Sequence, residues 1–122
     1  MFYLSRFMLL SFVAAVLGGC SSQDKPLAPS SSLVDISIVD NTFQPSVVTV
    51  AVGATVRWTN EDPACLCGDY HEVKSGTKDH PTSDFDLPFT EMGASGEFTF
   101  EHVGTYPYYC RNHGETGKVI VK

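Results

Sequence analysis

The 122-residue sequence is poor in positive charge, with eight lysines and arginines against fourteen acidic residues and a net charge of −6. Nucleic-acid binding requires a basic face toward the phosphates, so we expect no nucleic-acid partner. The four cysteines are too few for a mini-protein held together by disulfides. No ten-residue window carries a helical stripe of apolar residues, so helices are not expected to build the core.

The first nineteen residues resemble an export signal. Arg6 precedes the apolar run Phe7–Leu17, whose eleven residues fall well below the roughly 20 that a membrane-spanning helix needs. Leu17–Cys20 (LGGC) resembles the lipobox of bacterial lipoproteins, in which the cysteine is lipidated and becomes the mature N-terminus. We therefore expect residues 1–19 to be a lipoprotein signal peptide and Cys20 to carry a lipid. The alternatives are an ordinary cleaved signal and an uncleaved anchor.

The next segment, Ser21–Ser32, contains five serines and two prolines in twelve residues. A stretch of this composition cannot bury a core, so residues 20–32 are predicted to be the lipidated cysteine and a flexible tether. Residues 33–122 would then form one domain of the bacterial cell envelope, anchored by the lipid and lying in the periplasm or outside the cell.

The predicted domain consists of short strands. Period-two alternation or β-branched and aromatic runs predict strands at Val34–Ile38, Val47–Val52, Thr55–Thr59, His71–Ser75, Glu97–Glu101, Thr105–Cys110 and Lys118–Lys122. The rest of Asn60–Ser95 looks irregular, and Pro107 predicts an edge or an irregular point in its ladder. Seven to eight short strands in a domain of this size are typical of an all-β, Greek-key β-sandwich.

Three residues form a candidate metal site. Cys110 and His113 make a Cys-x-x-His pair at the end of a predicted strand, and His71 opens a strand 39 residues before Cys110. Alone, the pair is weak evidence, because a buried cysteine beside a surface histidine is common. A thiolate and two imidazoles in a trigonal arrangement, however, select copper and give a blue-copper electron-transfer site.

The sequence around these residues resembles the plastocyanin branch of the cupredoxins. The similar segments are Asn41–Pro45 (NTFQP), Val47–Asn60 (VVTVAVGATVRWTN), His71–Val73 (HEV), Gly104–His113 (GTYPYYCRNH) and Gly117–Val121 (GKVIV). The resemblance implies a β-sandwich that binds one copper ion through His71, Cys110 and His113 as equatorial ligands. It also implies that His113 reaches the surface and is the port through which electrons pass.

The axial copper ligand is one departure from that family, which normally supplies a methionine a few residues after the loop histidine. No methionine follows Met92 in this chain. The axial position is expected to be empty, or filled by Glu115, Thr116 or a backbone carbonyl. We favour an empty position, because Glu115 lies only two residues past His113 and bending back so tightly would strain the loop. The axial ligand tunes the reduction potential.

Cys65 and Cys67 are the second departure, in an enlarged loop before His71. They are expected to form a disulfide with each other, to remain thiols, or to bind a second soft metal ion with His71 or His80. The disulfide suits an oxidising compartment.

The predicted function is single-electron transfer by a monomeric, non-enzymatic copper protein. Its expected partners are envelope redox proteins such as a c-type cytochrome or an oxidase or reductase. The alternative is a copper-handling lipoprotein that stores or delivers the ion without a redox partner, which the missing methionine and the Cys65/Cys67 pair motivate. Multicopper catalysis is disfavoured, because it needs histidine clusters that four scattered histidines cannot form.

Overall fold

The computed structural model of the chain describes residues 31–63 and 70–122, so Cys20, Cys65, Cys67 and the predicted signal peptide lie outside the described residues. No helix that could cross a membrane occurs within the described ranges. The described residues form nine strands: β1 (Leu33–Val39), β2 (Thr42–Gln44), β3 (Val47–Val50), β4 (Ala54–Asn60), β5 (His71–Gly76), β6 (Pro81–Phe89), β7 (Ser95–Phe100), β8 (Gly104–Cys110) and β9 (Thr116–Val121).

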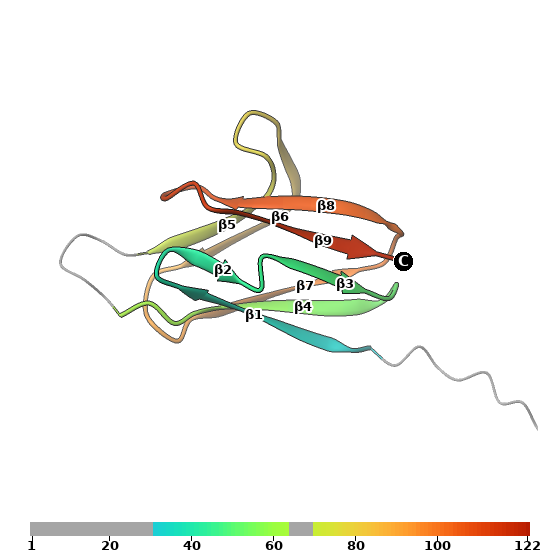
Figure 1. The fold of residues 1–122 in the computed structure, drawn as a ribbon, viewed down its shortest axis with the longest axis horizontal. Coiled ribbons are helices and arrows are strands. Elements are labelled where there is room, and N and C mark those ends of the chain that lie inside the picture. The colour runs from blue at the N-terminus through green and yellow to red at the C-terminus, as the bar shows by residue number, and fades with distance from the viewer. Residues whose placement is uncertain (1–30, 64–69) are drawn as a thin grey trace, which may run out of the picture.

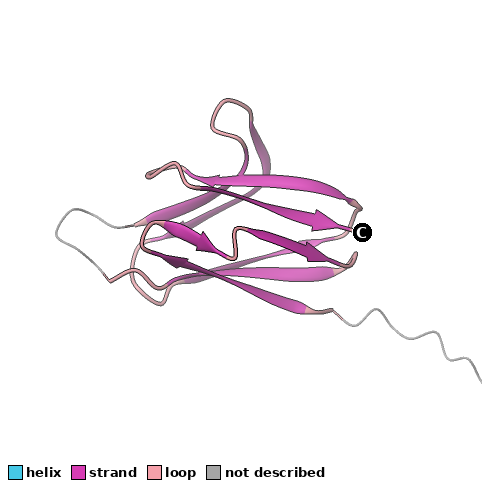
Figure 2. Cartoon of the chain, in the orientation of Figure 1, coloured by secondary structure: helices cyan, strands magenta, loops and turns pink. Residues whose placement is uncertain are grey.

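The strands form two sheets that face each other as a β-sandwich (Figures 1 and 2). One sheet has the order β2-β1-β4-β7, and the other has the order β3-β9-β8-β5-β6. The pairs β1–β4 and β3–β9 are parallel, and the other neighbours are antiparallel. The predicted all-β sandwich is confirmed, with nine strands in the part of the chain that the structure describes in place of seven or eight.

An aromatic cluster joins the two sheets. Trp58 on β4 is fully buried, and its ring centroid lies 5.3 Å from those of Tyr108 on β8 and Phe85 on β6. Aromatic pairs at this spacing add about 0.5–1.5 kcal/mol each beyond the area that they bury. Gly117 on β9 is paired with Tyr108, and a Cβ there would lie 2.3 Å from that ring. Glycine at this position therefore leaves room for the ring of Tyr108, which lies two residues before Cys110 in the chain.

Two strands were not predicted from the sequence, and both contain or adjoin proline. β6 begins at Pro81 and contains Pro88, yet it buries Phe85 and Phe89 and forms one edge of its sheet. Proline removes a ladder hydrogen bond and is tolerated at an edge, which is why this stretch looked irregular in the sequence. β2 is only three residues long and forms the edge of the other sheet.

Pro107 lies in β8, an inner strand of its sheet, opposite Lys118 on β9. The pairing of β8 with β5 begins one residue later, at Tyr108. Pro107 therefore lies one residue outside the β5–β8 ladder, where the absence of an amide donor is tolerated.

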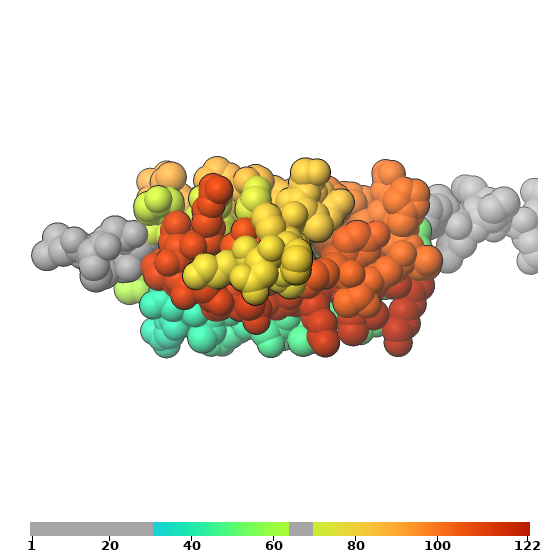
Figure 3. Space-filling model, turned by 90° about the horizontal axis from the view of Figure 1, so that it is seen from above, coloured from blue at the N-terminus to red at the C-terminus, as the bar shows by residue number. Residues whose placement is uncertain are grey.

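The tip of the β5–β6 hairpin projects from the five-stranded sheet beyond β8 and β9, and appears in yellow in the view from above (Figure 3). Thr77 and His80 exchange backbone hydrogen bonds of 3.0 and 3.1 Å across this tip. His80 is an exposed residue of this tip, and it is not one of the clustered metal-ligand side chains described next.

Candidate metal centre

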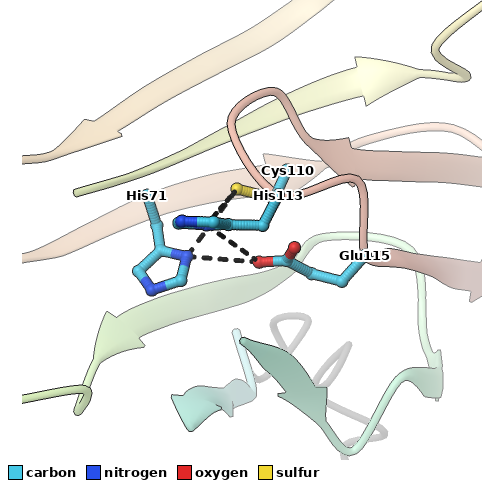
Figure 4. Close-up of side chains that lie close together, drawn as sticks. All are labelled: His71, Cys110, His113 and Glu115. Carbon is cyan, nitrogen blue, oxygen red and sulfur yellow. Dashed lines mark hydrogen bonds and ion pairs between the residues drawn. The ribbon is translucent and has the colours of Figure 1, made fainter. Parts of the chain in front are cut away.

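Four side chains with metal-binding atoms converge at one end of the sandwich (Figure 4). His71 opens β5, Cys110 ends β8, and His113 and Glu115 belong to the loop that leads from β8 to β9. One candidate ligand atom from each of the four lies within 4.8 Å of those of the others. The structure thus brings together the three residues that the sequence singled out and Glu115, one of the axial candidates.

The cysteine sulfur is equally distant from the two imidazoles. Cys110 Sγ lies 3.7 Å from Nδ1 of His71 and 3.7 Å from Nδ1 of His113, so both rings turn the same nitrogen toward the thiol. The His71 side chain is fully buried, whereas that of His113 is 27% exposed. One imidazole of the pair is therefore enclosed by protein and the other reaches solvent.

Backbone hydrogen bonds hold the loop that follows Cys110 and carries His113 and Glu115. The Cys110 amide donates to the Glu115 carbonyl at 2.9 Å, and the Gly114 amide donates to the Cys110 carbonyl at 3.0 Å. Gly114 has a φ of +88°, a left-handed conformation that glycine adopts without steric cost. The loop is also joined to the segment that begins β5, because Asn112 Nδ2 donates to the Tyr70 carbonyl at 2.7 Å.

The turn at Gly114 contradicts the expectation that Glu115 could bend back toward the site only by straining the loop. Its Oε1 lies 3.2 Å from Nδ1 of His71 and 3.9 Å from Nδ1 of His113, and its side chain is only 10% exposed. The left-handed bend at Gly114 reverses the chain within two residues of His113, so that Glu115 points inward without strain. Thr116, the other axial candidate, is exposed on β9 and is not among the clustered donors.

Asp62 is a site residue that the sequence reasoning missed. Its Oδ2 lies 3.0 Å from Nε2 of His71, on the side of the ring that faces away from Cys110, and its side chain is 9% exposed. Asp62 follows β4 in a stretch whose prolines and acids gave no periodic pattern, nine residues before His71. No signal in the sequence distinguishes it from the neighbouring surface acids.

In the acidic groups of the site, burial raises the pKa and hydrogen bonding lowers it. Burial disfavours the charged form of Asp62, but amide hydrogen bonds from Asn41 and Asp40 and the contact with His71 outweigh it, so the pKa of this carboxyl lies below its ordinary value. For Cys110, burial raises the pKa of the thiol, and nearby Glu115 adds to the rise. The protein alone therefore favours a protonated thiol, which a bound metal ion deprotonates.

The fold and the donor set define a cupredoxin. The family model described as a cupredoxin-like domain matches residues 8–121, and the chain belongs to that family. Plastocyanin of Scenedesmus fuscus is 36% identical over 77 residues, which make up 62% of this chain and 78% of that protein.

Solved structures show the same similarity. A purple cupredoxin from Nitrosopumilus maritimus superposes with a TM-score of 0.63 at 28% identity, over 73% of this chain and 99% of that one. A copper-containing nitrite reductase from Thermus scotoductus matches with a TM-score of 0.62 at 29% identity, again over 73% of this chain but over only 22% of the reductase. The fold thus occurs both as a separate small protein and as part of a larger enzyme.

The donor chemistry of this chain fits the single copper ion that the cupredoxin family binds. A cysteine sulfur and two imidazole nitrogens are the ligand types that select copper. Among the buried side-chain polar atoms of the described residues, Oε2 of Glu115 has no hydrogen-bond partner. A carboxylate enclosed next to two imidazoles with an unsatisfied oxygen is expensive to bury, and a cation at this position compensates its charge.

Proposed function

We propose that this chain is a mononuclear type 1-like copper protein that transfers single electrons in the cell envelope. In this proposal His71, Cys110 and His113 hold the copper ion, and Glu115 supplies a fourth, oxygen donor. The observation that carries the proposal is the convergence of one buried thiol and two Nδ1 atoms, each 3.7 Å from the sulfur. Copper supplies one-electron chemistry by alternating between Cu(II) and Cu(I).

A rigid donor set supports electron transfer, because a site that cannot rearrange has little to reorganise when an electron arrives. Cys110 is anchored at the end of a strand that is paired on both sides, to β5 and to β9. Two backbone hydrogen bonds join its amide and carbonyl to Glu115 and Gly114. His71 begins a strand paired with both β6 and β8.

The exposure of the two imidazoles indicates the route of the electron. His113 is 27% exposed, whereas His71 and Cys110 are fully enclosed. An electron that enters or leaves through His113 crosses one imidazole ring between the thiol-bearing centre and a docked partner. We therefore propose that His113 is the electron port and that the partner docks on the end of the sandwich around it.

Enclosure also favours electron transfer over copper delivery. An ion held by two fully buried residues can leave only if the β8–β9 loop opens, and that loop is tied by the bonds of Gly114 and Asn112. The carboxylate of Glu115 is a hard, anionic donor that favours Cu(II), whereas proteins that select Cu(I) use soft thiolate and thioether ligands.

Spectroscopy of the copper-loaded protein tests this proposal. We expect an intense visible thiolate-to-copper absorption, a type 1-like paramagnetic resonance spectrum and reversible one-electron reduction. The variant Cys110→Ser should lose the visible band, whereas the double variant Cys65→Ser/Cys67→Ser should keep it. Retention of the band in Cys110→Ser would overturn the ligand assignment. A colourless protein that binds Cu(I) without reversible reduction would favour copper handling instead.

We further propose that the domain works while tethered to a membrane by a lipid on Cys20, and exchanges electrons with redox proteins of the envelope. This part of the proposal rests on the LGGC motif at Leu17–Cys20 and the serine- and proline-rich segment after it. Lipidation at one residue anchors through buried methylenes, at about 0.8 kcal/mol each.

A further inference from the structure

The buried carboxylate of Asp62 contacts the nitrogen of His71 that does not face the metal centre. Asp62 Oδ2 lies 3.0 Å from Nε2, while Nδ1 of the same ring lies 3.7 Å from Cys110 Sγ. The two nitrogens of one buried imidazole are therefore engaged on opposite sides. An imidazole that binds a metal through Nδ1 carries its proton on Nε2, and that proton needs an acceptor when it is buried.

The carboxylate is itself fixed by the turn between β1 and β2, which lies in the sheet opposite to that of His71. The backbone amide of Asn41 donates to Oδ2 at 3.0 Å, and that of Asp40 donates to Oδ1. Both residues have left-handed backbones, with φ of 54° and 49°, in the turn between β1 and β2. This conformation, uncommon for residues other than glycine, directs two successive amides at one carboxylate. The Asp62 amide is held as well, since it donates to Asn60 Oδ1 at 3.0 Å.

We propose that Asp62 is a positioning residue for copper: it holds the proton of His71 on Nε2, presents Nδ1 to the metal, and links the β1–β2 turn to the metal centre. The inference rests on the proposed function, because it assigns His71 to copper. An ionised carboxylate only accepts hydrogen bonds, so the contact of Asp62 with Nε2 requires a proton on that nitrogen. Glu115 Oε1, 3.2 Å from Nδ1, makes the same demand on the other nitrogen until the metal ion takes the place of the Nδ1 proton. Its negative charge also makes Nδ1 a stronger donor, which favours Cu(II) over Cu(I).

An amide cannot replace this carboxylate. Asp62 accepts hydrogen bonds at both oxygens, from Asp40 at Oδ1 and from Asn41 and His71 at Oδ2. An asparagine has one acceptor oxygen and one NH₂ group, so one side of it must present a donor to a donor. If the oxygen faces Asp40, the NH₂ group faces His71 and favours the proton on Nδ1, the wrong nitrogen for binding.

The experiment compares Asp62→Asn with Glu61→Gln in the full-length protein. Glu61 is the adjacent residue, and its exposed carboxylate accepts a hydrogen bond of 2.9 Å from Ser37 Oγ. Both variants remove one negative charge at the same end of the molecule, but only Asp62→Asn alters the contact with His71. The readouts are the copper affinity, the reduction potential, and the Nε2–H proton resonance of His71 in the zinc-substituted, diamagnetic protein.

We expect Asp62→Asn to weaken copper binding by about 10- to 100-fold, the usual cost of losing a hydrogen-bond partner behind a metal-binding histidine. We also expect it to raise the potential, and to shift the Nε2–H resonance upfield with faster solvent exchange. Glu61→Gln should leave the resonance unchanged and alter affinity less than twofold. A Nε2–H proton in the wild-type protein that exchanges as fast as that of an exposed histidine would overturn the inference, whether or not the variant folds.

The failure of this inference can be told from failure of the proposed function. A protein that binds no copper through Cys110 would overturn both. A coloured, reversibly reduced copper protein in which Asp62→Asn and Glu61→Gln have the same affinity and potential would overturn the role of Asp62 alone.

Discussion

Glu115 Oε1 lies 3.2 Å from Nδ1 of His71, although 44 residues separate the two in the chain. The contact places a carboxylate among the donors of a cupredoxin whose sequence has no methionine after Met92. Axial ligands in such centres tune the reduction potential, and an anionic oxygen stabilises Cu(II) more than Cu(I). Under the proposed function, Glu115 therefore tunes the reduction potential of the centre, and this role can be tested directly.

The substitution Glu115→Gln should raise the reduction potential and shift the visible spectrum. We expect the preference for Cu(II) over Cu(I) to fall at least tenfold, which corresponds to about 59 mV for a one-electron couple. Voltammetry and absorption spectroscopy of the copper-loaded variant measure both effects. Thr116→Val is the matched control, since Thr116 is exposed and lies outside the donor cluster. An unchanged potential in Glu115→Gln would show that the carboxylate does not bind copper.

Removing either imidazole should have different consequences because their exposures differ. In His113→Gly, free imidazole from solution should enter the gap and restore the visible band, because the His113 side chain is 27% exposed. In His71→Gly the gap is fully enclosed, so imidazole should restore little or nothing, and stability should fall with the loss of a buried side chain. Titration of both variants with imidazole, followed by absorption, makes the comparison. Equal rescue of the two would contradict the proposed electron port.

The buried phenol of Tyr108 should make the free energy of unfolding depend on pH in the alkaline range. Burial raises the pKa of its phenol to about 12, from an ordinary value of 10.0. Above pH 10 the unfolded chain loses this proton while the folded protein keeps it, so the stabilisation present below pH 10 is lost as pH rises to 12. The loss amounts to about 3 kcal/mol over that range.

Tyr108→Phe should remove this part of the alkaline dependence. Its effect on stability at neutral pH should be small, because Tyr108 Oη is buried without a hydrogen-bond partner among the described residues. Urea denaturation at several values between pH 9 and 12 measures the slope, with Tyr70→Phe as the exposed control. Parallel pH profiles for wild type and Tyr108→Phe would be incompatible with a buried, protonated phenol.

Anchoring through Cys20 predicts a change in membrane association. Wild-type protein expressed with its N-terminal segment in a bacterial host should partition into membranes, because lipidated cysteine inserts acyl chains. Cys20→Ala should be released into the soluble fraction or accumulate as an unprocessed precursor, whereas Cys65→Ser should behave as wild type. Fractionation and mass measurement of the mature N-terminus decide the matter. Normal processing and undiminished membrane association of Cys20→Ala would rule out lipidation there.

The β-sandwich was predictable because most of its strands alternate between a buried and an exposed face. β4 buries every second residue from Ala54 to Asn60, so its period of two is visible in the sequence. β6 was not predicted, because its prolines are typical of loops and are tolerated in a strand mainly at the edge of a sheet. The edge strands β3 and β7, which contain no proline, were predicted, so it is the prolines of β6 and the three-residue length of β2 that hide these two strands from local pattern.

The residues of the metal centre likewise fall into those that the sequence identifies and those that only the structure reveals. The Cys-x-x-His spacing of Cys110 and His113 is local, and a histidine at the start of a strand is a recognisable pattern, so the sequence by itself identified these residues as candidates. Which carboxylates join them was decided only by the tertiary structure. Glu115 turns inward because Gly114 adopts a left-handed backbone. Asp62 is held against His71 by the β1–β2 turn, which lies in the sheet opposite to that of His71. Contacts of this kind depend on backbone dihedrals and on the packing of distant segments, neither of which residue spacing encodes.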